Sequence, residues 1–384
     1  MKIDIIGAGP AGLHFASLMK RLNPRHEITI HERGPRSATW GFGVVFSDQA
    51  LDFLRTDDNE LFEYLRPHME SWSDLTINHN GTSVPIAGNG YAAIGRLQML
   101  SLLYQHVERL GVTIRFDTEI TSLAQLKGAD LILAANGASS WVREENRDKF
   151  ATTTDIRPNK FMWCGSTMPF DTLSLSFHET GTGVFCAHHY RYTPAMSTFL
   201  IEVTDETWKR TGFDRMSNDE AMRHCEKVFA RELGGHPILS NNSYWRNFPV
   251  IWNGRWHFDN VVLMGDALRP AHFSIGSGTR MAMLDAVALC NAFRETDDDV
   301  PAALARFREL RMPVMKKIWD AANRSMRWYE EMDKLVPTQN AIEFAYDYMT
   351  RTGRISHAKV REIDPRLAAA YESQHPEVLD APGA

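Results

Sequence analysis

The chain has 384 residues, 43% of them hydrophobic, and a formal net charge of −6. That length allows two domains or one large composite domain, and a pI near 6.2 disfavours nucleic acid as a partner, which would require a basic surface. No apolar run approaches the roughly 18 residues of a membrane helix, and a strand predicted from Lys2 leaves no room for a signal peptide. The four cysteines show no CxxC spacing, which predicts reduced cytoplasmic thiols and no metal site.

The first part of the chain alternates short apolar strands with amphipathic helices, a pattern typical of a parallel sheet. The predicted elements are a strand at 2–6, a helix from residue 10, a strand at 28–32, a helix at 97–110, and strands at 112–116 and 130–135.

From about residue 160 to 203 the chain becomes strand-rich, and the glycines at 181–183 predict a hairpin turn. Further predicted elements are a helix at 217–233, a strand at 260–264, a helix at 276–293, and helical segments at 301–333 and 338–374. These patterns predict an α/β fold. A discontinuous Rossmann-like domain (1–155 and 255–300, with small β insertions near 70–95) is interrupted by a strand-rich substrate domain (156–254) and followed by a helical C-terminal region (301–384).

The strongest motif is Gly7-Ala8-Gly9-Pro10-Ala11-Gly12, which follows the first strand and opens a helix. Its glycines allow a tight turn and close approach of the backbone, and the N-terminus of the helix offers free N–H groups to a pyrophosphate. Glu32 ends the second strand twenty residues further on and can bind ribose hydroxyls, with Arg33 beside it. The motif predicts a dinucleotide site but does not separate FAD from NAD.

Later motifs favour FAD. Gly265-Asp266 ends a strand, Gly276-Ser277-Gly278 opens a helix, and Arg96 precedes another helix. In this arrangement the chain resembles the group A FAD-dependent aromatic hydroxylases, in which such a carboxylate holds the ribitol chain, the helix N-terminus faces the flavin and the arginine contacts the cofactor. The resemblance implies an FAD-binding domain, with further contacts from Gly43, Asn136, Gly137, Ser274 and Thr279.

The resemblance covers nearly the whole chain. Within the group, the chain is most similar to hydroxylases of aryl-CoA thioesters such as salicyloyl-CoA and anthraniloyl-CoA, and next to the violacein-pathway hydroxylase of a tryptophan-derived substrate. The matching segments are 40–48, 196–199 and 272–279, and the tail segment 350–357 favours the aryl-CoA branch. Three positions depart from the group: Asn136 stands in place of an aspartate, Arg269 in place of a histidine and Phe273 in place of a proline.

This resemblance implies a single-component monooxygenase that uses FAD, NAD(P)H and O2. A flavin C4a-hydroperoxide would hydroxylate a ring activated by a hydroxyl or amino group and carried as a CoA thioester, and the chain would act as a monomer or homodimer. Three alternatives are left open: a hydroxylase of an indole substrate, an oxygen-independent FAD oxidoreductase, and a non-catalytic flavin-binding protein.

Candidate catalytic residues are His272, His188 and Tyr190. Strand alternation places His188 and Tyr190 on one face and His189 on the other. For His188 and Tyr190 taken singly, a buried sheet position without a catalytic role is favoured. His272 is the stronger candidate because it lies close to the flavin-facing glycines.

The segment 300–361 holds twelve Lys and Arg against seven Asp and Glu, an excess of positive charge in an acidic chain. Solvated helix faces usually explain such runs. If the segment binds the phosphates of CoA instead, the candidates are Arg324, Arg327, Arg351 and Arg354.

Overall fold

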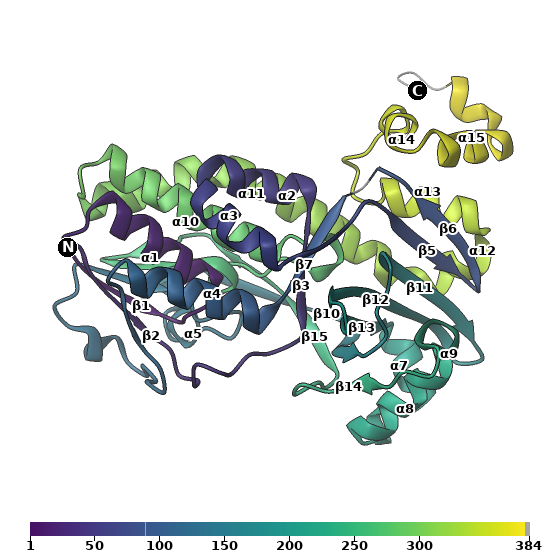
Figure 1. The fold of residues 1–384 in the computed structure, drawn as a ribbon, viewed down its shortest axis with the longest axis horizontal. Helices are drawn as coiled ribbons and strands as arrows, with labels where there is room; N and C mark the ends of the chain where they lie inside the picture. The colour runs from purple at the N-terminus through teal and green to yellow at the C-terminus, as the bar shows by residue number, and fades with distance from the viewer. Residues whose placement is uncertain (89, 381–384) are drawn as a thin grey trace.

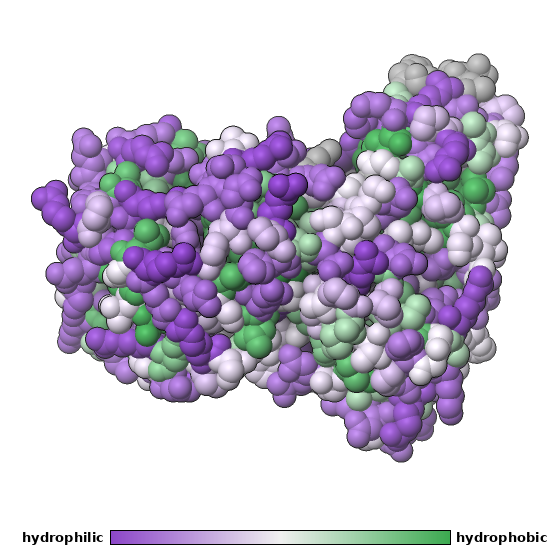
Figure 2. Space-filling model, viewed as in Figure 1, coloured by the Kyte–Doolittle hydropathy of each residue, from purple (hydrophilic) through white to green (hydrophobic). Residues whose placement is uncertain are grey.

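The computed structural model describes residues 1–88 and 90–380. It confirms the predicted α/β class, with two lobes and a group of C-terminal helices beside the second lobe (Figure 1). The visible face is largely hydrophilic, and a notch separates the C-terminal helices from the first lobe (Figure 2). No helix in the described part of the chain combines the length and apolar character needed to cross a membrane.

The first lobe is built on a six-stranded sheet with the order β16-β17-β9-β1-β2-β8. Its strands are β1 (Lys2–Ile6), β2 (Glu27–His31), β8 (Thr113–Arg115), β9 (Leu131–Ala134), β16 (His257–Phe258) and β17 (Val261–Leu263). All neighbours pair in parallel except β16 with β17. The central strands β1, β9 and β17 are apolar and buried, as expected for a parallel sheet covered on both faces.

The second lobe is built on an eight-stranded sheet with the order β14-β10-β13-β12-β11-β5-β6, and β15 also pairs with β10. Its strands are β5 (Leu75–His79), β6 (Thr82–Ile86), β10 (Thr152–Ser166), β11 (Leu173–Thr180), β12 (Gly183–Thr193), β13 (Met196–Val203), β14 (Ile238–Leu239) and β15 (Arg246–Asn253). The predicted hairpin turn at 181–183 is confirmed because it joins β11 to β12.

The predicted insertion near 70–95 is divided between two sheets. β5 pairs in parallel with β11 and extends the eight-stranded sheet, whereas β4 (Glu70–Trp72) and β7 (Tyr91–Gly95) form a three-stranded sheet with β3 (Gly43–Ser47). The first 155 residues therefore contribute to both lobes, because β5 pairs with β11, which lies about a hundred residues further along the chain, and β6 pairs with β5. The exact domain boundaries remain a prediction.

The helices are α1 (Pro10–Leu22), α2 (Asp48–Asp57), α3 (Asn59–Leu65), α4 (Arg96–Arg109), α5 (Trp141–Glu145), α6 (Arg147–Phe150), α7 (Asp205–Thr211), α8 (Asn218–Val228), α9 (Ala230–Leu233), α10 (Gly278–Glu295), α11 (Val300–Glu330), α12 (Met332–Thr338), α13 (Ala341–Thr350), α14 (His357–Ile363) and α15 (Pro365–Gln374). Helices α1 and α10 pack against each other, and α10 packs against the 31-residue α11. α11 extends from the first lobe to the second (Figure 1), where its last turns enter the core of the second lobe.

Each large sheet has its own apolar core. A third, smaller cluster is formed by Phe161, Leu200, Phe248 and Met326, with Trp163, Val250 and Phe273 packed against it. We call these seven side chains the aromatic cluster. Its members come from β10, β13, β15, α11 and the turn before α10, so it lies where the two lobes meet.

Candidate active site

The glycine turn before α1 has the geometry of a phosphate site. Gly7 adopts a φ of +102°, and a Cβ there would lie 2.6 Å from the carbonyl oxygen of Ala135. A Cβ at Gly12 would lie 2.6 Å from the carbonyl oxygen of Gly7, whereas a Cβ at Gly9 would meet nothing within 4 Å. The first turn of α1 has no side-chain cap, so its N–H groups face open space that suits a pyrophosphate.

Glu32 supports this turn with both of its carboxylate oxygens. Oε2 accepts a hydrogen bond from the N–H of Ala8, and Oε1 accepts one from the N–H of Gly34, each at 2.9 Å. Sequence reasoning expected only a contact with ribose. The carboxylate also holds the loop in place, and each oxygen keeps a second acceptor position for a ribose hydroxyl. Arg33 lies exposed beside it.

Asp266 and Arg96 mark the other end of the site. Asp266 follows β17 in a short 3-10 turn and is accessible, yet burial raises its pKa, against the opposing effect of Arg96. Burial likewise lowers the pKa of Arg96, against the effect of Asp266. Both side chains are surrounded by protein but not fully buried, as expected for residues that line a ligand site. Asn136 also has a buried Oδ1 without a partner. These polar groups fit the ribitol and ring edge of FAD.

The segment before α10 differs in one detail from the prediction. The helix begins at Gly278 rather than Gly276, because Gly276 takes a left-handed φ of +57° and ends a 3-10 turn at Phe273–Ile275. Ser277 occupies the N-cap position without a capping side-chain bond, and the first turn contains no acidic residue. The free N–H groups and positive end of this 18-residue helix suit the electron-rich N1–C2=O edge of a flavin. Thr279 lies in this first turn.

Tyr190 takes a different part from the one predicted for it. Its hydroxyl donates to the carbonyl of Gly43 at 3.0 Å, while the N–H of Gly43 donates to Oγ1 of Thr198 at 2.9 Å. Burial raises the pKa of Tyr190, so the phenol stays protonated. Tyr192 packs so closely that a Cβ on Gly43 would lie 2.6 Å from its ring. These contacts fix β3 against the eight-stranded sheet and account for the glycine, and we no longer expect Tyr190 to act as a base.

The structure also reverses the order of His272 and His188 as candidates for a catalytic role. The N–H of Ser274 donates to Nδ1 of His272 at 3.4 Å, and burial lowers the pKa of His272 to about 4. His272 is therefore a neutral side chain that caps the turn at Ser274. His188 instead lies beside a carboxylate, with Nε2 3.5 Å from Oε2 of Glu202. Its ring is 5.5 Å from that of Phe273 in the aromatic cluster.

Glu202 was missed in the sequence, although a signal was present. It stands within the apolar strand segment 199–203, where the pairing register places it on the same face as His188. A charged residue at an inward position of an apolar strand requires a partner. As predicted, His189 lies on the opposite face, where it bonds Ser176 at 2.9 Å.

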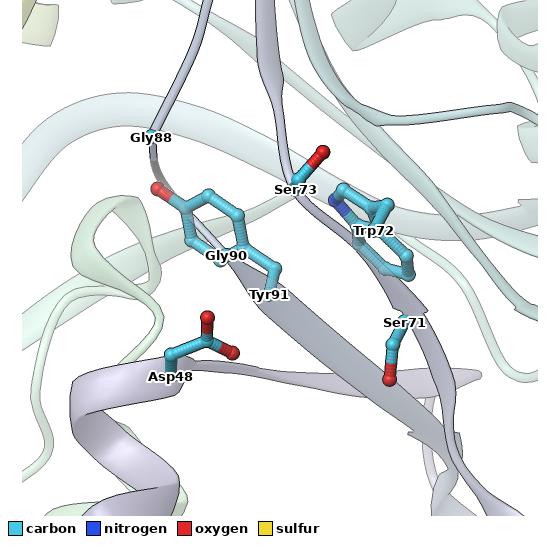
Figure 3. Close-up of a pocket in the computed structure, with 7 residues that line it drawn as sticks. All are labelled: Asp48, Ser71, Trp72, Ser73, Gly88, Gly90 and Tyr91. Carbon is cyan, nitrogen blue, oxygen red and sulfur yellow. The ribbon is translucent and has the colours of Figure 1, made fainter. Parts of the chain in front are cut away.

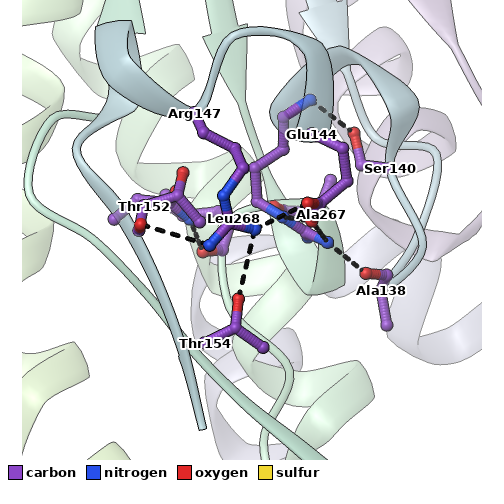
Figure 4. A network of polar contacts seen from close by, with 10 residues as sticks. Ala138, Ser140, Glu144, Arg147, Thr152, Thr154, Ala267 and Leu268 are labelled. Carbon is purple, nitrogen blue, oxygen red and sulfur yellow. Dashed lines mark hydrogen bonds and ion pairs between the residues drawn. The ribbon is translucent and has the colours of Figure 1, made fainter.

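The departures at Arg269 and near Asn136 are compensated by other side chains. Arg269 is buried and pairs with Asp285 at 2.5 Å, and Arg311 pairs with the same carboxylate at 2.7 Å. Arg143 donates to the carbonyls of Ala267 and Ala138, which joins the loop after β9 to the turn at Asp266. Figure 4 shows the surrounding network, in which Arg147 continues to Thr152.

The four arginines proposed for CoA differ in their surroundings, although Arg324 lies beside the turn at residues 352–353, between Arg351 and Arg354. Arg324 and Arg327 line a cavity of about 190 Å³ that also includes Trp319, Val250 and Met326. Arg351 uses its guanidinium within the protein: it donates to the hydroxyl of Ser325 and to the carbonyls of Tyr348 and Ser274. Arg354 is exposed and lies near Arg280. The pKa of Arg280 is lowered mainly by burial and further by the positive charge of Arg354.

A second cavity, of about 430 Å³, opens beside the three-stranded sheet. Figure 3 shows Asp48 below the ring of Tyr91, and Trp72, on the neighbouring strand, to the right of both. Trp72 stacks on Tyr190 with 6.3 Å between the ring centres, so one residue of the cavity wall contacts the tyrosine that binds Gly43.

The glycine turn, Asp266 with Arg96, and the uncapped start of α10 together form the candidate site for a dinucleotide cofactor. Comparison with known proteins gives the same class, since residues 126–322 match the family described as "FAD binding domain". Salicyloyl-CoA 5-hydroxylase from Streptomyces sp is 38% identical over 92% of this chain and 70% of its own length. Protodeoxyviolaceinate monooxygenase from Chromobacterium violaceum is 34% identical, covering 91% and 94%. The 3-hydroxy-4-methyl-anthranilyl-[aryl-carrier protein] 5-monooxygenase from Streptosporangium sibiricum is 32% identical, covering 93% and 95%.

Solved structures share the fold at lower identity. 2-Methyl-3-hydroxypyridine-5-carboxylic acid oxygenase superposes with a TM-score of 0.69 at 15% identity, covering 94% of this chain and 95% of its own. P. aeruginosa PqsL superposes with a TM-score of 0.68 at 17% identity, covering 88% and 98%. The chain belongs to the FAD-binding-domain family of flavin-dependent aromatic monooxygenases. FAD is its cofactor, and NAD(P)H and O2 are the co-substrates of this class.

Proposed function

We propose that this monooxygenase hydroxylates an activated aromatic ring carried as a CoA thioester, in the manner of salicyloyl-CoA 5-hydroxylase. The observation that carries the proposal is the position of the Arg324–Arg327 cavity. Val250 and Met326 belong both to this cavity and to the aromatic cluster. A ring held by the cluster would therefore face this arginine-lined cavity across Val250 and Met326, and we infer that the pantetheine arm of CoA leaves the ring in this direction.

The ion pairs around this cavity leave the guanidinium of Arg327 available to bind a phosphate. Arg157 is held by Glu330 at 2.6 Å and by Asp155 at 2.6 Å, and Asp320 pairs with Lys316. Arg327 makes no ion pair with the described residues, and the Nε of Arg324 donates to the carbonyl of Thr352. The indole face of Trp319 can stack on a base. We assign Arg324 and Arg327 to CoA phosphates, and Arg351 to the support of the turn before α10.

Reduced FAD, once bound, supplies the chemistry: with O2 it transfers one oxygen atom to the ring. The residues of the chain bind FAD, orient the substrate and exclude water from the site. The glycine turn and α1 would hold the pyrophosphate, Asp266 the ribitol, and the start of α10 the flavin edge. The aromatic cluster would pack on the substrate ring and keep water away from it. We further propose a cytoplasmic location, since all four cysteines are buried and unpaired.

Two named relatives favour a carried substrate over a free one. One is named for salicyloyl-CoA and another for an anthranilyl group on an aryl-carrier protein. The relative named for protodeoxyviolaceinate keeps an indole-type substrate as the second candidate. The relatives are named as hydroxylases or monooxygenases, so nothing favours an oxygen-independent reaction.

The test is product analysis by mass spectrometry with the FAD-loaded chain, NADH or NADPH, and salicyloyl-CoA, anthraniloyl-CoA, free salicylate or a tryptophan-derived substrate. We expect an aryl-CoA to gain one oxygen atom, and only when O2 is present. With 18O2 the added atom should carry the label. Product from free salicylate at an equal rate would contradict the CoA assignment. Product under argon would contradict the oxygen chemistry.

A further inference from the structure

Glu202 is a carboxylate enclosed by the protein, and no Lys or Arg in the described part of the chain forms an ion pair with it. It is 1% exposed and lies on β13, opposite Cys186 of β12 and Phe161 of β10. One oxygen accepts a hydrogen bond from the amide of Asn159 at 2.8 Å, and the other, Oε2, has no hydrogen-bond partner among residues 1–88 and 90–380. A buried negative charge held by one amide costs free energy unless a positive charge forms nearby.

His188 is the group in position to carry that positive charge. Its Nε2 lies 3.5 Å from Oε2 of Glu202 and has no other partner. The ring packs between Tyr329 at 5.0 Å and Phe273 at 5.5 Å, and 10% of the side chain stays accessible. Nδ1 makes no hydrogen bond with the described part of the chain. One ring nitrogen therefore faces the carboxylate, and the other is free for a molecule beside the aromatic cluster.

The other titratable groups packed around this pair stay neutral near pH 7. Burial lowers the pKa of His272 to about 4 and raises that of Tyr329 and of Cys186. Arg351 keeps its charge but directs its donors to Ser274, Ser325 and Tyr348. A proton released by a substrate in this region is therefore best received by His188, since only there does a carboxylate balance it.

We infer that Glu202 is a positioning residue that holds His188 with its proton on Nε2, so that Nδ1 accepts a proton from the ring hydroxyl or amino group of the substrate. This inference rests on the proposed function. For a phenol, the ring O–H bond breaks, its electron pair stays on oxygen and an N–H bond forms on His188. No electron is gained or lost by the protein. The resulting phenolate directs electrophilic oxygen to its ortho and para carbons, and the imidazolium is balanced by Glu202.

The chain contains a matched pair for comparison on the other face of the same sheet. Nε2 of His178 lies 2.9 Å from Oε1 of Glu232, with a direct hydrogen bond. That pair contacts Phe229 in the core of the second lobe rather than the aromatic cluster. Glu232→Gln thus removes an equivalent carboxylate without approaching the substrate, and it controls for general effects on the sheet.

The first measurement follows the imidazole nitrogens by 15N NMR in the FAD-loaded full chain without substrate, with His188 assigned from His188→Gln. We expect the form protonated on Nε2 to dominate at pH 8, and the imidazolium population at pH 6 to fall about tenfold in Glu202→Gln. Glu232→Gln should leave His188 unchanged. A dominant Nδ1–H form in the unaltered chain, or an unchanged imidazolium population in Glu202→Gln, would overturn the inference.

The second measurement uses turnover of salicyloyl-CoA between pH 6 and 9. In Glu202→Gln we expect kcat at pH 7 to fall at least tenfold, with KM little changed, and to recover as pH rises and the phenol ionises unaided. A loss that does not recover with pH would indicate a merely structural carboxylate and overturn the inference. If the unaltered chain yields no product from salicyloyl-CoA, the proposed function fails, while the NMR comparison still decides the role of Glu202.

Discussion

Arg351, at the C-terminal end of α13, donates from Nη2 to the carbonyl oxygen of Ser274 at 2.9 Å. The two residues are 77 positions apart, and the contact joins the C-terminal helices to the turn that leads into α10. The guanidinium also lies 3.7 Å from the centre of the Tyr348 ring. The C-terminal region thereby braces the side of the site where the flavin ring would lie.

We expect Arg351→Ala to weaken both stability and cofactor binding. Removing hydrogen bonds from a charged donor costs about 1.5–3 kcal/mol, and a loosened turn should raise the dissociation constant for FAD about tenfold. Thermal unfolding of the apo chain and flavin-fluorescence titration measure the two effects. Lys359→Ala, whose ammonium pairs with Glu362 on α14 away from this turn, is the control. Unchanged stability combined with weaker binding of CoA alone would instead support the original assignment of Arg351 to CoA phosphate.

The glycine turn allows binding and folding to be separated. At Gly9 the space beyond an added methyl is open, so we expect Gly9→Ala to fold with unchanged apo stability and to lose FAD, because the methyl enters the pyrophosphate position. At Gly12 the methyl would meet backbone at 2.6 Å, so Gly12→Ala should lower the melting temperature as well. Calorimetry of the two apo variants measures their stability, and FAD titration measures their affinity for the cofactor. Equal FAD affinity in Gly9→Ala and the unaltered chain would refute the placement of the pyrophosphate at Gly9.

The sequence predicted what depends on neighbours along the chain. The turn at Gly7–Gly12, the strand before it and the hairpin at 181–183 follow from local spacing and residue type. It did not predict that β5 joins β11, because strand pairing across about a hundred residues leaves no local signal. α2 and α3 were also missed, although Ser47 and Asp58 cap them in the usual way.

Side-chain roles were less predictable than backbone structure for the same reason. Tyr190 was a catalytic candidate because of its face of the strand. Its hydroxyl instead donates a hydrogen bond to the carbonyl of Gly43, which lies 147 positions away in the sequence. His272 was favoured for its proximity to the glycines, and its desolvation is visible only once the lobes are packed. The choice between His188 and His272 depends on Glu202, which no motif includes.

Asp266 should show a conflict between stability and binding. The surrounding protein raises its pKa above that in the unfolded chain, so the ionised carboxylate lowers the stability of the folded apo chain at pH 7, an effect that the accessibility of Asp266 reduces. We therefore expect Asp266→Asn to raise the melting temperature of the apo chain at pH 7, with the gain vanishing near pH 3, where the carboxyl is protonated in both states. FAD affinity should fall at least tenfold because the ribitol loses a charged acceptor. Asp214→Asn, in a surface turn, serves as control, and a lower apo melting temperature for Asp266→Asn would contradict this reading.

Two buried histidines should make the chain sensitive to acid. Burial lowers the pKa of His272 to about 4 and that of His189 to about 3, so both stay neutral when folded but take up protons when unfolded below about pH 6.5. The unfolded state then binds more protons, and stability falls as pH drops from 6.5 towards 4, by about 1.4 kcal/mol per pH unit for each histidine. His189→Gln should remove one such contribution, so the free energy of unfolding from urea titrations at pH 7, 6 and 5 should decline less steeply, whereas the exposed His68→Gln should not change the slope. Parallel slopes for His189→Gln and the unaltered chain would show that His189 is protonated in the folded state, against its burial beside Phe170 and Phe199.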